Sequence, residues 1–329
     1  MRGESPMLNI LDLAVAFPDR TEKLASLSAE LALSRNQMRM YDRFFGFDAF
    51  HCDHDEPLDA LLSRVIDAIR KRNPGYFDTL DHVAYCHTLP STTVLNGRTG
   101  AILAPFAERG AEVFSATMNH CATGVGMLGV FDQLLGDGEV GLILIGEKAF
   151  HPAMRVIENT TIMGEAAAAV LVGREPGAYS MVGSFTRHAT SFWRNTGLRG
   201  ENYLEGFEAA YLELASGTLR DAMTRFGRDL DALRWIMPHN VNAPSWYQIA
   251  ERVGLDPRKL QLATIGCYGH CFGADPFINL CHGAHTGALR PDDEIMLFSV
   301  GLGASASCAL LQVSAPITRP IQSEQEISQ

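Results

Sequence analysis

Short apolar runs of strand length alternate with helical patterns along most of the chain. In the first half the apolar runs are residues 8–16, 82–85, 113–115, 140–145 and 166–172. In the second half they are residues 179–184, 235–237, 294–300 and 308–313, with helical patterns at 203–225 and 246–253. This alternation is typical of α/β proteins. The pattern therefore predicts an α/β fold in which the order of elements is repeated.

Each half of the chain ends on a strand rich in glycine and alanine, MGEAAAAVLVG in the first and VGLGASASCALLQV in the second. Small residues at these places favour two similar units stacked back to back, with sheets and helices packed closely. The length of 329 residues and a hydrophobic content of 47% suit two fused half-size units with a large buried core. We expect an N-terminal half over residues 1–174, a C-terminal half over residues 175–329, and a loosely held polar tail at 315–329.

The charge distribution excludes some partners. The formal net charge is -11 and no dense stripe of lysine and arginine is present, so nucleic acid is not expected to bind. A small basic patch at Arg35, Arg39 and Arg43 could dock an acidic carrier protein; the alternative is an ordinary solvated helix face. No apolar run reaches the roughly 18 to 20 residues that cross a bilayer, so we do not expect a membrane protein. Seven cysteines behind a start without a signal peptide predict a cytoplasmic protein with reduced thiols.

Cys121 is the candidate nucleophile. It lies in EVFSATMNHCATGVGMLGVFDQLLGDG, which reads as a strand, a sharp turn and a helix with apolar residues at Val125, Leu128 and Phe131. The first turn of a helix stabilises an anion, and therefore favours a thiolate over a thiol whose ordinary pKa is about 8.5. The alternative is a buried structural cysteine, the commonest role of an unpaired thiol.

Two histidines of the second half are candidate catalytic groups. His239 follows a strand and a proline, at the kind of strand end where catalytic side chains gather in such sheets. His270 lies in a glycine-rich turn, and Asp275 follows five residues later at the start of an apolar helix. A nucleophile, a histidine and a carboxylate that orients the histidine form a known catalytic arrangement. The remaining histidines have no such context, and we interpret them as structural.

Other cofactor signals are weak. Cys267 and Cys271 with His270 and His282 could suggest zinc, but paired CxxC spacing is absent. No P-loop is present, and VGLGAS at residues 300–305 is too short a match to a dinucleotide fingerprint. We expect no permanently bound cofactor.

Taken together, the motifs resemble the ketoacyl synthase III family of the thiolase superfamily over nearly the whole chain and in the expected order. The blocks that carry the resemblance are CATG at 121–124, IGEKAF at 145–150, MGEAAAAVLV at 163–172, PHNVN at 238–242 and GLGASASCALL at 301–311. The resemblance implies a five-layered αβαβα fold, a homodimer, and an acyl donor carried by coenzyme A or by an acyl carrier protein. It also implies that Cys121 accepts the acyl group, that His239 is catalytic, and that the backbone N–H groups of Cys121 and Gly303 form the oxyanion hole.

The chain departs from the family pattern at two places. His270 stands after Gly269 where the family has asparagine, and Glu165 replaces the usual aspartate. Histidine there, with Asp275 five residues later, resembles members that transfer acyl groups to a hydroxyl, an amine or a carrier thiol in specialised metabolism. It also resembles condensing synthases that use a Cys-His-His site for decarboxylative carbon–carbon bond formation. A third alternative is a non-catalytic dimer partner of another ketosynthase, against which the intact Cys121 and both histidines argue.

Overall fold

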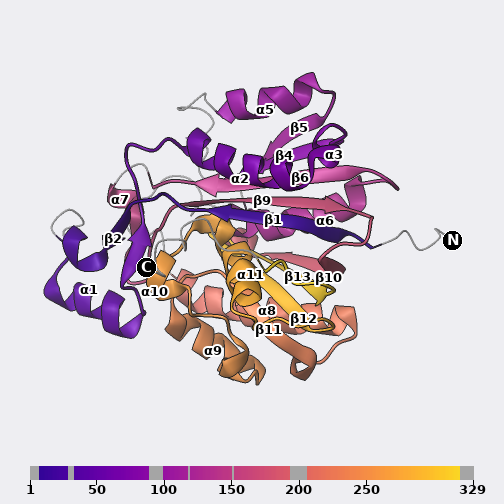
Figure 1. The fold of residues 1–329 in the computed structure, drawn as a ribbon. Coiled ribbons are helices and arrows are strands. Elements are labelled where there is room, and N and C mark those ends of the chain that lie inside the picture. The colour runs from indigo at the N-terminus through magenta and orange to yellow at the C-terminus, as the bar shows by residue number, and fades with distance from the viewer. Residues whose placement is uncertain are drawn as a thin grey trace.

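The computed structural model describes residues 7–28, 33–88, 99–117, 119–149, 152–192 and 206–318. The long strands are β1 (Asn9–Ala16), β4 (His82–Cys86), β5 (Glu112–Ala116), β6 (Val140–Glu147), β9 (Ala166–Gly173), β10 (Tyr179–His188), β11 (Leu233–Pro238), β12 (Glu294–Gly301) and β13 (Ser305–Val313). The main helices are α2 (Leu58–Arg72), α5 (Thr99–Glu108), α6 (Thr123–Leu134), α8 (Phe207–Phe226), α9 (Ala243–Val253) and α11 (Asp275–His285) (Figure 1).

Nine strands form one sheet with the order β11-β12-β13-β10-β1-β9-β6-β4-β5. The sheet contains the same arrangement twice. In both β1-β9-β6-β4 and β10-β13-β12-β11, the first two pairings are antiparallel and the third is parallel. The two units join through a short antiparallel contact in which Ile10 lies opposite Tyr179. The order of elements is therefore repeated, as the sequence pattern predicts.

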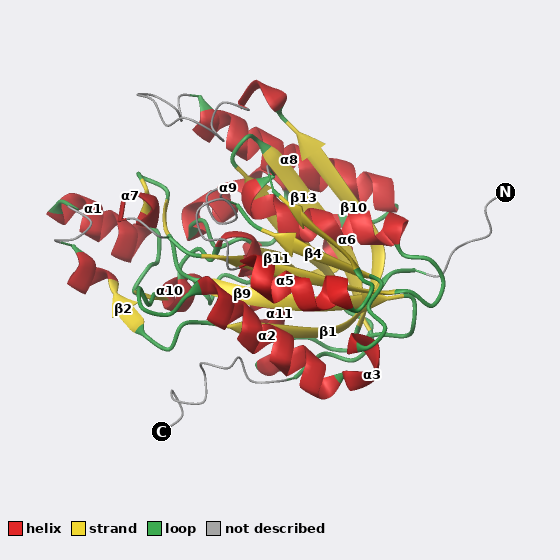
Figure 2. Cartoon of the chain, turned by 90° about the horizontal axis from the view of Figure 1, so that it is seen from above, coloured by secondary structure: helices red, strands yellow, loops and turns green. Residues whose placement is uncertain are grey.

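The helices complete five layers. α2 covers the outer face of β1, β9 and β6, whereas α8 covers the outer face of β10 and β13 and packs on α9. Between the two sheet units lie α6, which contacts β6 on one side and β13 on the other, and α11, which contacts β1 and β11. Figure 2 shows α2 and α8 on opposite sides of the strands. The predicted αβαβα architecture is confirmed.

Strand β9 shows why the alanine run AAAAVLV forms a central strand. Ala166, Ala168, Val170 and Val172 face the inner cluster with α6 and α11, whereas Ala167, Ala169 and Leu171 face the outer cluster under α2. A strand buried on both faces needs apolar residues at every position, with no polar alternation. The alanines also leave room for helices on both sides.

Glycines in α6 permit the close approach of this helix to the second sheet unit. A Cβ atom at Gly129 would lie 2.5 Å from Ser184 Oγ, and one at Gly126 would lie 3.0 Å from Ser307 Oγ. These contacts bring α6 against strands β10 and β13 of the second half. The catalytic candidates of the two halves meet there.

Some boundaries differ from those expected. α9 begins at Ala243, three residues earlier than predicted, because the Asn242 side chain accepts the Ser245 N–H at 2.8 Å and caps the helix. α8 begins at Phe207, and residues 203–205 of the predicted helix lie outside the described residues.

The polar tail begins with residues that contact the core. The first residues of the polar tail, 315–318, are held on the core, where Ile317 N–H donates to Tyr179 Oη at 3.2 Å; residues 319–329 lie outside the described ranges. The predicted boundary at 174/175 falls in the turn between β9 and β10, and we retain the two-domain division as a proposal. Among the described helices, none combines the length and apolarity that crossing a bilayer requires.

Candidate active site

Cys121 lies in the short 3-10 turn η3 (His120–Ala122), directly before α6, and its exposed fraction is only 9%. The preceding residue, His120, has a φ of 48°, in the left-handed region that a non-glycine residue seldom adopts. Ser299 of β12 donates through Oγ to the Cys121 carbonyl oxygen at 2.7 Å. The turn that carries the thiol is therefore held by the second half of the chain.

His270 lies in contact with Cys121, although 149 positions separate them. Its Nε2 is 3.2 Å from Cys121 Sγ, and its Nδ1 forms a short hydrogen bond to Asp275 Oδ2. The backbone of His270 is also fixed, because its N–H donates to Ile162 O at 2.9 Å and its carbonyl accepts the Gly164 N–H at 3.0 Å. The structure thus brings Cys121, His270 and Asp275 together in the order of a catalytic triad.

Asp275 is held by two further donors. Asn240 N–H donates to Oδ2 at 2.6 Å, and Cys271 N–H donates to Oδ1 at 2.7 Å. The carboxylate is fully buried at the first residue of α11, where the helix dipole favours negative charge. These contacts hold the Asp275 carboxylate in one orientation and stabilise its negative charge next to His270.

The environment of His270 favours its protonated form. Burial alone lowers the pKa of a histidine, but the charges of Asp275 and Cys121 and their hydrogen bonds outweigh burial and raise the pKa of His270 to about 10. His270 is therefore an imidazolium at neutral pH, placed between a carboxylate and a sulfur. Such an arrangement activates a cysteine nucleophile.

His239 lies on the other side of His270, with the two ring centroids 5.8 Å apart. Burial and the neighbouring His270 hold the pKa of His239 well below its usual value, so this imidazole is neutral. Its Nδ1 accepts the Val300 N–H at 3.4 Å, and its Nε2 lies 3.2 Å from the hydroxyl of Tyr211 on α8. The two predicted histidines therefore share one site but carry different charges.

Two polar residues of the site carried no assigned role in the sequence analysis. Asn240 links the loop after β11 to the His270 segment, because its N–H binds Asp275 and its side chain donates to Gly269 O at 3.1 Å. Tyr211 belongs to an unremarkable helical pattern. Asn240 belongs to the PHNVN motif, which could have indicated a role in the site, whereas the sequence around Tyr211 contains no motif that indicates one.

Gly303 lies in the turn between β12 and β13, with a φ of 129° that favours glycine. Both sides of this turn touch the nucleophile segment. A Cβ atom at Gly301 would lie 2.0 Å from Asn119 O, and Ser305 Oγ lies 3.2 Å from Asn119 Oδ1. The turn that carries Gly303 is thus packed against the turn that carries Cys121, as an oxyanion hole shared by their N–H groups requires.

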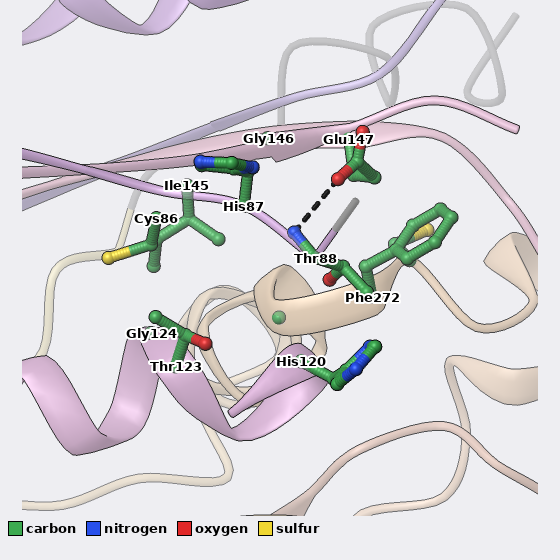
Figure 3. Close-up of a pocket in the computed structure, with 12 residues that line it drawn as sticks. Cys86, His87, Thr88, His120, Thr123, Gly124, Ile145, Gly146, Glu147 and Phe272 are labelled. Atoms are coloured by element: carbon green, nitrogen blue, oxygen red, sulfur yellow. Dashed lines mark hydrogen bonds between the residues drawn. The ribbon is translucent and has the colours of Figure 1, made fainter. Parts of the chain in front are cut away.

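The surroundings of Cys121 are apolar on one side and polar on another. Ala149, Met163 and Phe272 form a small buried cluster with Cys121. A small cavity of about 10 Å³ lies beside this turn, between the ends of β4 and β6, the start of α6 and the segment around Phe272. Figure 3 shows His87, His120 and Glu147 around this cavity, with Glu147 accepting the Thr88 N–H at 2.8 Å.

Glu165 is part of a buried ionic network and not of the triad. Its carboxylate lies 2.7 Å from Arg155 and 3.4 Å from Lys148, and all three side chains are buried. Arg155 also donates to Met163 O at 2.9 Å. Removing one member of such a network would leave uncompensated buried charge. The network therefore supports the segment between β8 and β9 in which Met163 pairs with His270 and Gly164 N–H donates to His270 O.

The predicted basic patch lies away from the triad. Arg35 and Arg39 are on α1 (Arg35–Arg39), Arg43 is on the following π-helical turn η2 (Met40–Phe44), and all three are exposed. Figure 1 shows α1 at the margin of the molecule, beside β2 (Thr21–Lys23). Among the described side chains, no group of three or more histidine, cysteine, aspartate or glutamate residues is arranged to hold a metal ion.

Comparison with known proteins agrees with this geometry. Residues 223–313 match the family model of the C-terminal part of 3-oxoacyl-[acyl-carrier-protein] synthase III. The chain is 26% identical over 206 residues to a beta-ketoacyl-[acyl-carrier-protein] synthase III of Rhodospirillum rubrum, a match that covers 56% of this chain and 63% of that protein. It is 25% identical over 317 residues to the protein of the same name from a Ruegeria species, with 90% and 96% covered.

Solved structures share the fold over nearly the whole chain. ChlB3, named as an acyltransferase, matches with a TM-score of 0.79 at 15% identity and covers 95% of this chain and 99% of its own. FabH of Pseudomonas aeruginosa, a 3-oxoacyl-(acyl carrier protein) synthase III, matches with a TM-score of 0.76 at 19% identity, with 94% and 99% covered. OleA of Xanthomonas campestris matches with a TM-score of 0.74 at 19% identity, with 93% and 98% covered. The match of residues 223–313, the relatives and the shared thiolase-like fold together show that the chain is similar to ketoacyl synthase III proteins.

Proposed function

We propose that this protein is an acyltransferase that takes an acyl group from an acyl-CoA or acyl-carrier-protein thioester onto Cys121 and passes it to a hydroxyl, amine or carrier thiol. The observation that carries the proposal is the continuous contact from Cys121 Sγ through His270 to Asp275. A histidine that is oriented by a buried carboxylate is suited to moving a proton between sulfur and a heteroatom. The similarity to ketoacyl synthase III proteins limits the chemistry to acyl transfer or condensation.

In the proposed acylation step the proton of Cys121 is held by His270, and Sγ reacts as a thiolate. Cys121 Sγ attacks the carbonyl carbon of the donor thioester, and the bond from that carbon to the carrier sulfur breaks. The Nε2 proton of His270 goes to the departing sulfur, which leaves as a thiol. The oxygen that becomes negative in between would bind the N–H groups of Cys121 and Gly303, and each such donor is typically worth about 3 kcal/mol in the transition state.

Transfer reverses the direction of the proton. The neutral His270 accepts a proton from the hydroxyl, amine or thiol as that atom attacks the acyl carbon, and Cys121 leaves as a thiolate. Asp275 stabilises the imidazolium that forms, and the N–H groups of Asn240 and Cys271 hold Asp275 in place. The cycle ends with the same charge pair with which it began.

Decarboxylative condensation is the second candidate, and one observation favours it. His239 is neutral and its Nδ1 accepts the Val300 N–H, so its Nε2 carries a proton that could be donated to a thioester carbonyl. That donor would stabilise the carbanion left when a malonyl group loses carbon dioxide. Simple transfer is preferred because the Asp275 partner makes His270 an effective base, whereas condensation needs neutral donors on both sides.

The partners belong to the same proposal. The donor is an acyl-CoA or an acyl carrier protein, and the exposed Arg35, Arg39 and Arg43 would attract an acidic carrier. The departure from the common family pattern at His270 supports a role in a specialised metabolite pathway. None of the seven cysteines, all of which lie in the described residues, forms a disulfide, and the family resemblance predicts a homodimer.

The test is incubation with acyl and malonyl thioesters, followed by intact-mass measurement and detection of carbon dioxide. We expect a stable acyl adduct that disappears in Cys121→Ala but persists in Cys267→Ala, an exposed cysteine. Release of carbon dioxide that depends on His239 would contradict simple transfer and support condensation. Absence of an adduct with every thioester would support the non-catalytic alternative.

A further inference from the structure

Tyr211 places a buried hydroxyl on the polar end of His239. It lies in the second turn of α8, its exposed fraction is 8%, and its Oη is 3.2 Å from His239 Nε2. Its ring meets the His239 ring edge to face, with centroids 6.1 Å apart, and packs on Phe207 at the same distance. Packing therefore holds the hydroxyl where it is.

The direction of this hydrogen bond follows from the other nitrogen of the ring. The Val300 N–H donates to His239 Nδ1 at 3.4 Å, and in the tautomer that accepts this bond Nδ1 carries no proton. The neutral imidazole then has its proton on Nε2, and this N–H donates a hydrogen bond to Tyr211 Oη. Burial and the nearby Cys121 raise the pKa of Tyr211, so the phenol remains protonated and neutral.

We propose that Tyr211 determines reaction specificity by occupying the Nε2–H donor of His239 and thereby suppressing decarboxylative condensation. The proposal rests on the proposed acyltransferase function and explains why a site with two histidines would favour simple transfer. It assigns a role to a residue outside the triad.

The suppressed step shows what the hydroxyl prevents. In a bound malonyl thioester the bond between the carboxylate carbon and the methylene carbon breaks and carbon dioxide leaves. The electron pair of that bond moves onto the methylene carbon and the thioester oxygen, forming an enolate whose carbon would attack the acyl carbon, and the bond from that carbon to Cys121 Sγ would break with Cys121 leaving as a thiolate. That oxygen needs a donor such as His239 Nε2–H. While the donor is bound to Tyr211 Oη, the thioester oxygen has to displace a packed phenol to reach it.

The experiment compares the unaltered protein with Tyr211→Phe, which keeps the ring and removes only the hydroxyl. With a malonyl thioester, we expect the variant to release carbon dioxide between about hundredfold and thousandfold faster, the range that one donor to an oxyanion provides. Acyl-adduct formation on Cys121 should be retained. The added decarboxylation should be lost in Tyr211→Phe/His239→Ala, which shows that it uses the released N–H.

A matched control is Tyr179→Phe, which removes a buried tyrosine hydroxyl bonded to Ile317 N–H. This variant should decarboxylate like the unaltered protein. Equal rates in Tyr211→Phe and the unaltered protein would overturn the proposal, and a lower rate would show that the phenol is itself the donor.

A second measurement does not depend on the folding of the variant. Nitrogen-15 NMR of the unaltered protein should show a neutral His239 protonated on Nε2, and a proton on Nδ1 would overturn the proposal. Failure of the acyltransferase function has a different signature, because the unaltered protein would then form no acyl adduct at all, whatever the state of Tyr211.

Discussion

The two halves of this protein have the same strand pairing but contribute opposite chemical groups to the site. In the first half, the edge strand β5 leads through a tight turn to α6, and the turn presents the nucleophile Cys121. In the second half, the equivalent outer position next to β11 is reduced to a single parallel bridge between Ile236 and Leu260. The chain then leads through a longer segment to α11 and presents His270 and Asp275.

A repeated strand arrangement can place different residues at equivalent positions around one site. The turn that carries Cys121 contacts the turn at residues 272–274, which lies directly before α11. A Cβ atom at Gly124 would lie 3.1 Å from Gly273 O, which shows how closely these turns approach. A nucleophile and its base can therefore come from the two copies of one arrangement.

The largest expected effect comes from replacing His270, the base that the second half contributes to the site. His270→Asn, which introduces the residue usual in the family, should lower the rate of acyl transfer by about 10⁴-fold, because no base remains to deprotonate the acceptor. The measurement is single-turnover transfer from the isolated acyl enzyme. His285→Asn, an exposed histidine at the end of α11, is the control. Transfer at the original rate would exclude His270 as the base.

Asp275→Asn should lower transfer by about 10³-fold and also change its pH dependence. The pKa of His270 is raised to about 10 because Asp275 and Cys121 outweigh the effect of burial. A raised pKa keeps the imidazolium, which protonates the departing thiol, present to higher pH. The acylation rate of the unaltered protein should therefore fall as pH rises through about 10.

Asp275→Asn removes a negative charge that raises the pKa of His270, so the acylation rate of this variant should fall at a lower pH. Rapid-quench mass measurement of the acyl enzyme across this range gives both profiles. Asp67→Asn, exposed on α2, should retain the original profile. Superimposable profiles for Asp275→Asn and the unaltered protein would show that Asp275 does not set the protonation of His270.

Gly301→Ala tests the contact between the halves. The added Cβ would lie 2.0 Å from Asn119 O and 2.9 Å from His120 Cβ, so the turn before Cys121 has to move. We expect acylation to slow by about 10-fold to 100-fold, and the free energy of unfolding to fall by about 1 to 3 kcal/mol. Gly75→Ala, where a Cβ meets nothing within 4 Å, is the control. Unchanged acylation with a loss of stability would separate packing from catalysis here.

The smallest effect is expected at the basic patch of the first half. Replacing Arg35, Arg39 and Arg43 with glutamate should lower kcat/KM for an acyl carrier protein by about tenfold at low salt and leave a small acyl thioester unaffected. Kinetics at two salt concentrations with both donors measure this. The charge-matched control replaces Arg234, Arg258 and Lys259 of the second half with glutamate. An equal loss with both donors would show damage to the site and not to carrier docking.

Much of the fold was predictable because strands buried on both faces are written as continuous apolar runs. β6 and β9 coincide closely with the runs VGLILI and AAAAVLV. The short two-stranded sheets β2/β3 (Ala49–His51) and β7 (Val156–Ile157)/β8 (Thr161–Ile162) were not predicted, because pieces of two or three residues carry no periodicity. The start of α9 was placed late, because its cap lies inside the PHNVN motif.

The sequence by itself determined the class of fold, the order of elements and the identity of Cys121, His239, His270 and Asp275 as candidates, because each stands in a local pattern. Only the tertiary structure decided that His270 contacts Cys121 and that His239 contacts Tyr211. Hydrogen bonds act over about 3 Å and depend on direction. Residues separated by 149 positions, as Cys121 and His270 are, come within that distance only when both halves have folded against each other.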